Sequence, residues 1–132
     1  MSTHPDYAIF DTTNFPTVIV SFTGSQANEE NFSNYLIKTK SLYNDKRELA
    51  IIFDATDASL PGIKYQKMQA EWLKTNEALM KKYCKGTAYV ISNKLVRAIL
   101  TAIFKFQKQP VPYLIVPTIT EAKSWSRDIL KQ

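Results

Sequence analysis

The feature that most constrains the fold is an apolar run over residues 49–53, followed by a polar loop over 54–62 and then by a long helical pattern. An apolar run bounded by turn residues is typical of a strand buried on both faces, as in parallel sheets covered by helices. Ligands of open α/β sheets bind beyond the carboxyl ends of such strands. The sequence therefore predicts an α/β fold with its candidate functional edge at 54–62.

The other elements follow from apolar periodicity and turn residues. Strands are expected over 7–12, 16–22, 49–53, 87–91 and 113–116, and helices over 28–43, 59–85, 93–108 and 118–130. The order is β-β-α-β-α-β-α-β-α, and the first two strands form a hairpin. Strands that alternate with helices imply right-handed crossovers. We therefore expect one α/β domain over 1–132, with a mixed five-stranded sheet and four helices.

Capping and turn residues define the expected helix ends. Ser59 is expected to cap the long helix and Gly86 to end it. Ser92 is expected to cap the next helix, and Thr118 with Glu121 forms a capping box for the last one.

Charge is distributed unevenly along the 132 residues, whose net charge is +5. The segment 64–108 holds ten basic and two acidic residues, whereas the rest holds seven basic and ten acidic residues. Such a segment can attract an acidic partner, but an ordinary solvated lysine surface is the simpler explanation. Only Arg97 among the ten is arginine, which disfavours base recognition, so nucleic acid is an unfavoured partner.

The cellular compartment is inferred from cysteine content and targeting signals. Cys84 is the single cysteine and is expected as a structural thiol at a helix end. The first residues lack a signal-peptide pattern, and no apolar stretch approaches the ~20 residues of a membrane span. A cytoplasmic protein is therefore expected.

Several segments carry a resemblance to a known family. They are 16–24, 51–54, 70–73, 86–91, 97–106 and 120–125. In these patterns the chain resembles the STAS-like, or SpoIIAA-like, family of small bacterial domains of the STAS/SEC14 type. The resemblance implies a five-stranded sheet with four helices and a regulatory or scaffolding module that has no enzymatic activity and no cofactor.

The resemblance also directs attention to the loop after the buried strand. Phosphorylatable relatives carry an Asp-Ser-Ser/Thr-Gly motif at a helix start, and residues 57–62 depart from it. Ser59 is the serine in the comparable place, so Ser59, Asp54 and Asp57 are candidates for a phosphorylation or regulatory loop. The alternative is that Ser59 only caps the helix and the two carboxylates bond loop amides.

Enzymatic and metal chemistry has little support in the sequence. His4, in the first residues, is the only histidine, so a catalytic triad is not expected. Two loop carboxylates form a weak cation site without further ligands, so no metal is expected.

The helix expected over 93–108 is apolar around most of its circumference, and one sheet covers only one side of a helix. The candidate partner-binding residues are Leu95, Val96, Ile99, Leu100, Ile103, Phe104 and Phe106. Candidate anion or rim contacts are Lys64, Lys94, Arg97 and Lys105. The competing interpretation is that neighbouring helices of the same chain cover this helix.

Two functions from different classes remain open. The first is a non-enzymatic interaction module that binds a protein partner or forms a homodimer through helix 93–108. The alternative is a carrier of a small apolar or anionic, lipid-like ligand. A basic amphipathic helix is also compatible with peripheral membrane contact.

Overall fold

A computed structural model describes residues 4–106 and 108–132, except for the side chains of residues 99, 103, 105 and 106. Its strands are β1 (Ala8–Asp11), β2 (Thr17–Phe22), β3 (Leu49–Asp54), β4 (Cys84–Val90) and β5 (Tyr113–Val116). They form one sheet in the order β1-β2-β3-β4-β5. β1 pairs with β2 antiparallel and the other three pairs are parallel, which confirms the predicted mixed five-stranded sheet.

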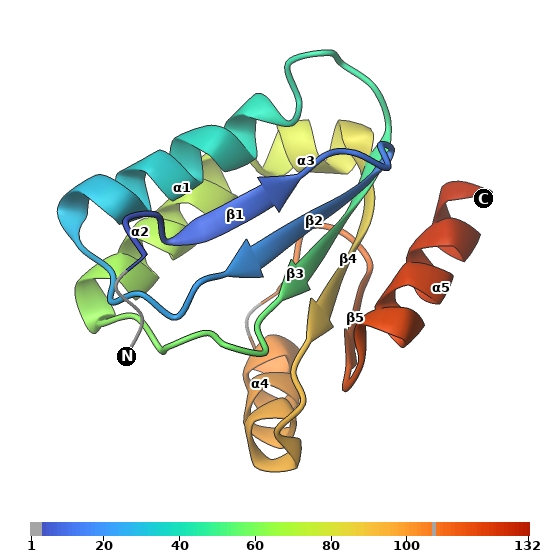
Figure 1. Ribbon diagram of the computed structural model, residues 1–132. Coiled ribbons are helices and arrows are strands. Elements are labelled where there is room, and N and C mark those ends of the chain that lie inside the picture. The colour runs from blue at the N-terminus through green and yellow to red at the C-terminus, as the bar shows by residue number, and fades with distance from the viewer. Residues whose placement is uncertain (1–3, 107) are drawn as a thin grey trace.

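The described helices are α1 (Glu29–Ser41), α2 (Ile63–Thr75), α3 (Glu77–Tyr83), α4 (Lys94–Phe106) and α5 (Ile119–Leu130). Right-handed crossovers between strands that follow one another across a sheet place their helices on one face. Accordingly α1, α2 and α3 lie on one face (Figure 1). α5 follows the last strand and covers the other face, whereas α4 lies beyond the lower ends of β3 and β4 (Figure 1).

The prediction of four helices was wrong, because the long helix is divided at Asn76. The Asn76 backbone has φ −105° and ψ 14°, outside the helical region. Its backbone N–H and its side-chain Nδ2 both donate to the carbonyl of Trp72, each at 2.9 Å. Asparagine side chains compete with the helix in this way for backbone partners. The chain therefore ends α2 and starts α3 at this residue.

Two predicted helix caps were also wrong. Gly62 is the N-cap of α2 and provides no side-chain bond, whereas the Ser59 hydroxyl donates to the carbonyl of Ser25 at 3.3 Å. At the start of α4, Asn93 Oδ1 accepts from the backbone N–H of Val96 at 3.1 Å. Because the amide oxygen of asparagine is as good a cap as a hydroxyl, Asn93 replaces Ser92 in this role.

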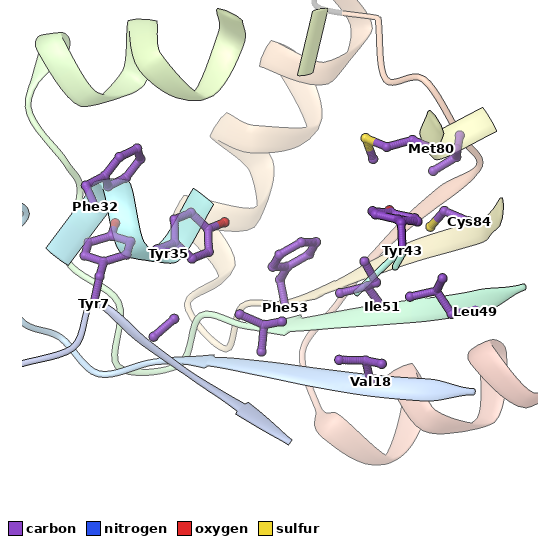
Figure 2. Packing of buried hydrophobic residues seen from close by; sticks show 13 residues of the cluster. Tyr7, Val18, Phe32, Tyr35, Tyr43, Leu49, Ile51, Phe53, Met80 and Cys84 are labelled. Atoms are coloured by element: carbon purple, nitrogen blue, oxygen red, sulfur yellow. The ribbon is translucent and has the colours of Figure 1, made fainter. Parts of the chain in front are cut away.

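The larger core lies between the sheet and helices α1 and α3. We call this side of the sheet the helical face. Side chains at alternate positions of β2 and β3 point to this face, as a period of two requires. Figure 2 shows them beneath Tyr7 and side chains of the α1 region and α3. The buried set includes Tyr7, Val18, Val20, Phe32, Tyr35, Tyr43, Leu49, Ile51, Phe53, Met80 and Cys84. All five residues from Leu49 to Phe53 are buried, as predicted for a strand covered on both faces.

The opposite face has a smaller core, beneath α5. Ile52, Ala88 and Val90 of the sheet pack there with Ala122. Gly86 does not end a helix as predicted, because α3 ends at Tyr83 and β4 already begins at Cys84. A Cβ atom on Gly86 would lie 2.6 Å from the Trp125 ring, so this close approach of α5 requires glycine.

Candidate functional site

Helix α4 is attached to the sheet near its carboxyl-terminal end. The ring of Phe104, in the last turn, meets the rings of Tyr89 and Tyr113 edge-on, with centroid distances of 5.3 and 5.2 Å. Aromatic pairs at this distance and orientation stabilise packing. Tyr89 also stacks on Phe53 at 5.4 Å, which links α4 to the aromatic core of the helical face.

The first turn of α4 is fixed by Arg97. Its guanidinium Nη1 donates to the carbonyls of Ile91 and Ser92 at 3.0 and 2.9 Å, so it bonds the connection between β4 and α4. A charged donor strengthens such bonds. Arg97 therefore has a structural role that the sequence interpretation, which assigned it to the anion rim, did not foresee.

Four exposed apolar side chains lie in the two segments that leave the carboxyl ends of β3 and β4. The two segments start side by side, because the N–H of Ala55 donates to the carbonyl of Val90 at 2.9 Å. In the β3–α2 connection and the first turn of α2, Leu60 is 87% and Ile63 71% exposed. In the first turn of α4, Leu95 is 70% and Val96 42% exposed. We call Leu60, Ile63, Leu95 and Val96 the carboxyl-edge set.

The structure divides the predicted partner-binding residues of α4. Leu95 and Val96 are exposed, whereas Leu100 and Phe104 are half-buried. The side chains of Ile99, Ile103 and Phe106 lie outside the described part. The first turn of α4 is thus not enclosed by its own chain, and partner binding stays a prediction.

The predicted basic rim is only partly free. Lys64 forms an ion pair with Glu29 at 2.5 Å, and this carboxylate raises the pKa of Lys64. Lys94 is exposed and belongs to none of the ion pairs of the described residues. The side chain of Lys105 lies outside the described part.

The candidate regulatory loop contains one engaged and one exposed carboxylate. Asp54 Oδ1 accepts from the backbone N–H and the hydroxyl of Thr56, at 3.1 and 2.6 Å, which closes the turn after β3. Asp57 is exposed, and Ser59 lies three residues before the Gly62 cap. Ser59 is therefore not the cap of α2, and its phosphorylation stays a prediction.

The sequence interpretation missed Leu60 and Ile63. A signal for them exists, since two large apolar residues flank Pro61 and Gly62 in a segment that is otherwise polar. Leu60 lies in the connection before α2 and Ile63 in its first turn, outside the apolar stripe that the sequence pattern defined for this helix.

Cys84 is buried in the helical-face core. Its Sγ lies 3.4 Å from the carbonyl of Gly86, and burial raises the pKa of the thiol to about 11. Because the thiolate is the nucleophile, this thiol is unreactive near neutral pH. Burial also raises the pKa of the neighbouring Tyr89 to about 12.

The surface of the described residues has hollows beside α4 and beside α5. One, of about 670 Å³, lies where α4 joins β5 and includes Phe104, Lys108 and Tyr113 in its wall. The other, of about 420 Å³, lies between β2 and α5. Across the described ranges, no three His, Cys, Asp or Glu side chains gather as metal ligands would. Likewise, none of the helices described is long and apolar enough to cross a bilayer.

Comparison with known proteins identifies the class of fold. No protein-family model and no curated protein matches the chain. A solved structure does match, that of an uncharacterized protein from the DUF3478 family with a SpoIIAA-like fold from Shewanella loihica PV-4. It is 11% identical, covers 96% of this chain and 98% of its own, and has a TM-score of 0.71. The chain is therefore an α/β protein with a SpoIIAA-like fold.

Proposed function

We propose that the protein is a non-enzymatic interaction module that binds a second copy of itself through the carboxyl-edge set. One observation carries the proposal: four of the six most exposed large apolar side chains in the described part belong to two segments that leave the same edge of the sheet. Exposed large apolar side chains that share one edge of a sheet are candidates for a protein contact, whereas single ones scattered over a surface are ordinary.

The charges beside this set favour a protein over a membrane or a nucleic acid. Asp57, on the β3–α2 connection, and Lys94, at the start of α4, are both exposed. An anionic bilayer or a phosphate backbone attracts only the basic residue and repels the acidic one. A protein surface accommodates both signs, with apolar side chains at the centre and charges at the rim.

The same charges favour a second copy as the partner. Neither Asp57 nor Lys94 belongs to an ion pair of the described chain. In a two-fold dimer each surface meets itself, so a surface that holds one acid and one base can place each opposite its counterpart. The contact is therefore self-complementary in charge and buries apolar side chains of both copies.

The non-enzymatic part of the proposal is supported by the state of the reactive groups. The Cys84 thiol is buried and its pKa is raised by that burial, so it is not an activated nucleophile. The Asp54 carboxylate is engaged in the turn with Thr56.

Sedimentation of the protein over a concentration series tests the proposal. We expect the wild-type mass to rise with concentration, and Leu95→Asp to weaken association at least about tenfold, or 1.4 kcal/mol. Ile37→Asp is the matched control, since Ile37 lies on α1 and is 66% exposed. A wild-type protein that is monomeric at every concentration, or an equal effect of the control, would refute the proposal.

A charge exchange tests the pairing itself. Asp57→Lys and Lys94→Asp should each weaken association, and the double variant should restore it, because both charges change sign together. If the two effects simply add in the double variant, these residues do not face each other across a dimer.

A further inference from the structure

A groove between β2 and α5 lies on the face of the sheet opposite α1. It is lined on β2 by Thr17 and Ile19, on α5 by Lys123, Arg127, Leu130 and Lys131, and its volume is about 420 Å³. We propose that this groove binds a small organic phosphate, with the phosphate on the cations and an apolar body against Ile19 and Leu130. The proposal is independent of the carboxyl-edge set.

Three cations form a row along one side of α5. Lys123, Arg127 and Lys131 follow one another at a spacing of four, which places them on the same helix face about 6 Å apart. All three are exposed, and none belongs to an ion pair of the residues described. Their positive charge is therefore available to a ligand.

The nearby acids offset the charge of this row only in part. Asp11 lies opposite Ile19 in the sheet, and its Oδ1 accepts from the Thr13 N–H at 2.9 Å. The hydrogen bonds to Thr13 are the main cause that lowers the pKa of Asp11, and the attraction of Lys123 contributes less. Asp128 follows Arg127 directly, so it lies about 100° further round the helix.

The helix dipole alone does not explain the row. Cations near a helix end stabilise its negative pole, which accounts for Arg127 and Lys131. That effect is confined to the last turn, and Lys123 lies in the first half of α5. The dipole also gives no reason for the half-buried Ile19 and Leu130 in the same groove.

The lining residues together define the class of ligand. An arginine guanidinium presents a planar fork that matches two phosphate oxygens, and the flanking lysines add point charges. The apolar residues favour a ligand with a hydrocarbon or aromatic part. The volume of the groove lies in the range of small-molecule sites. A phosphate monoester of an apolar alcohol, free or as a lipid headgroup, combines these properties.

Titration with phenyl phosphate, followed by amide shifts in NMR spectra, tests the site. We expect saturable binding with shifts at Thr17, Ile19 and the second half of α5. Arg127→Glu should weaken binding at least about tenfold, because it replaces the fork with a repelling carboxylate. The matched control is Lys38→Glu, on α1 at the other face, which should change affinity by less than about twofold. Inorganic phosphate should bind more weakly, because it lacks the apolar part.

Vesicles distinguish the two sources of the phosphate. If the protein sediments with phosphatidylcholine vesicles only when they contain phosphatidic acid, and Arg127→Glu abolishes this, the ligand is a lipid headgroup. Binding of phenyl phosphate without sedimentation identifies a free ester. The proposal is overturned if neither probe binds, if Lys38→Glu weakens binding as much as Arg127→Glu, or if inorganic phosphate binds as tightly as phenyl phosphate.

Discussion

Helices α4 and α5 are both amphipathic, yet the fold uses them differently. α5 lies across a sheet face and buries Ala122 and Ser126 completely. α4 packs on the sheet through Phe104 near its end, and leaves Leu95 in its first turn exposed. An amphipathic pattern thus specifies which side of a helix is apolar, but it does not specify what that side meets.

The difference follows from the part of the sheet that is free for each helix to pack against. α5 packs on Gly86, which has no side chain, and on Ala88, which has a small one, so the helix approaches the sheet closely. α4 joins β4 to β5 on the face where α3 already packs against β4. Only the end of α4 reaches the sheet there, and the rest extends beyond its carboxyl edge (Figure 1).

The largest effect is expected when the same substitution, alanine to aspartate, is compared in the two helices. Ala122 is completely buried and Ala102 is exposed. Ala122→Asp should destabilise the protein by about 3–5 kcal/mol, because it buries an unpaired charge. Ala102→Asp should cost no more than about 1 kcal/mol, mostly from helix propensity. Urea denaturation of dilute protein measures both, and equal losses would contradict the contrast between the helices.

A smaller effect is expected at the attachment of α4. Phe104→Ala removes the edge-on contacts with Tyr89 and Tyr113, at an expected cost of about 2 kcal/mol. Leu95→Ala should change stability by less than about 0.5 kcal/mol, because the side chain is exposed. Hydrogen exchange of the α4 amides should quicken only in the first variant. A larger loss for Leu95→Ala would mean that the first turn is packed.

The smallest expected effect is a loss of stability at alkaline pH, caused by the Cys84 thiol in the core of the helical face. Burial raises the pKa of Cys84 from 9.0 to about 11, so folding keeps the proton that the unfolded thiol releases. This contribution is complete below pH 9 and is lost as the pH rises towards 11. Between pH 8 and 10 the free energy of unfolding should fall by about 1 kcal/mol for this reason.

Comparison with Cys84→Ala isolates this contribution, since the buried tyrosines titrate in both proteins. The free energy of unfolding of the variant should fall less steeply between pH 8 and 10. Parallel pH profiles would show that the thiol titrates alike in the folded and unfolded chains.

Much of the fold could be predicted because its signals are local and periodic. The apolar run at 49–53 specified the buried strand, and Thr118 caps α5 as predicted. The Glu121 carboxylate accepts from the Thr118 hydroxyl at 2.9 Å, whereas a capping box would have it accept from the Thr118 backbone N–H. The division at Asn76 could not be predicted, because it depends on a side-chain bond from Asn76 to the carbonyl of Trp72 that competes with the helix and that the apolar period does not show. The role of Gly86 depends on Trp125, which is distant in sequence and carries no local signal.

The candidate site was predicted less completely than the fold. The apolar character of α4 was visible in its composition, but the exposure of Leu95 depends on where the helix lies. Leu60 and Ile63 lie at the junction of the β3–α2 connection and α2, and only the fold places this junction at the same edge as α4. The groove at α5 could not be predicted, because its wall includes Ile19, which belongs to a strand about a hundred residues earlier.

The last strand has a consequence for how copies of the chain can meet. β5 is four residues long, ends the sheet on one side, and lies between Pro112 and Pro117. Proline offers no backbone N–H, and short edge strands flanked by it are poor templates for strand addition. Fibrillar growth from this border is therefore disfavoured, so we expect assembly to use side-chain surfaces instead of an extended intermolecular sheet.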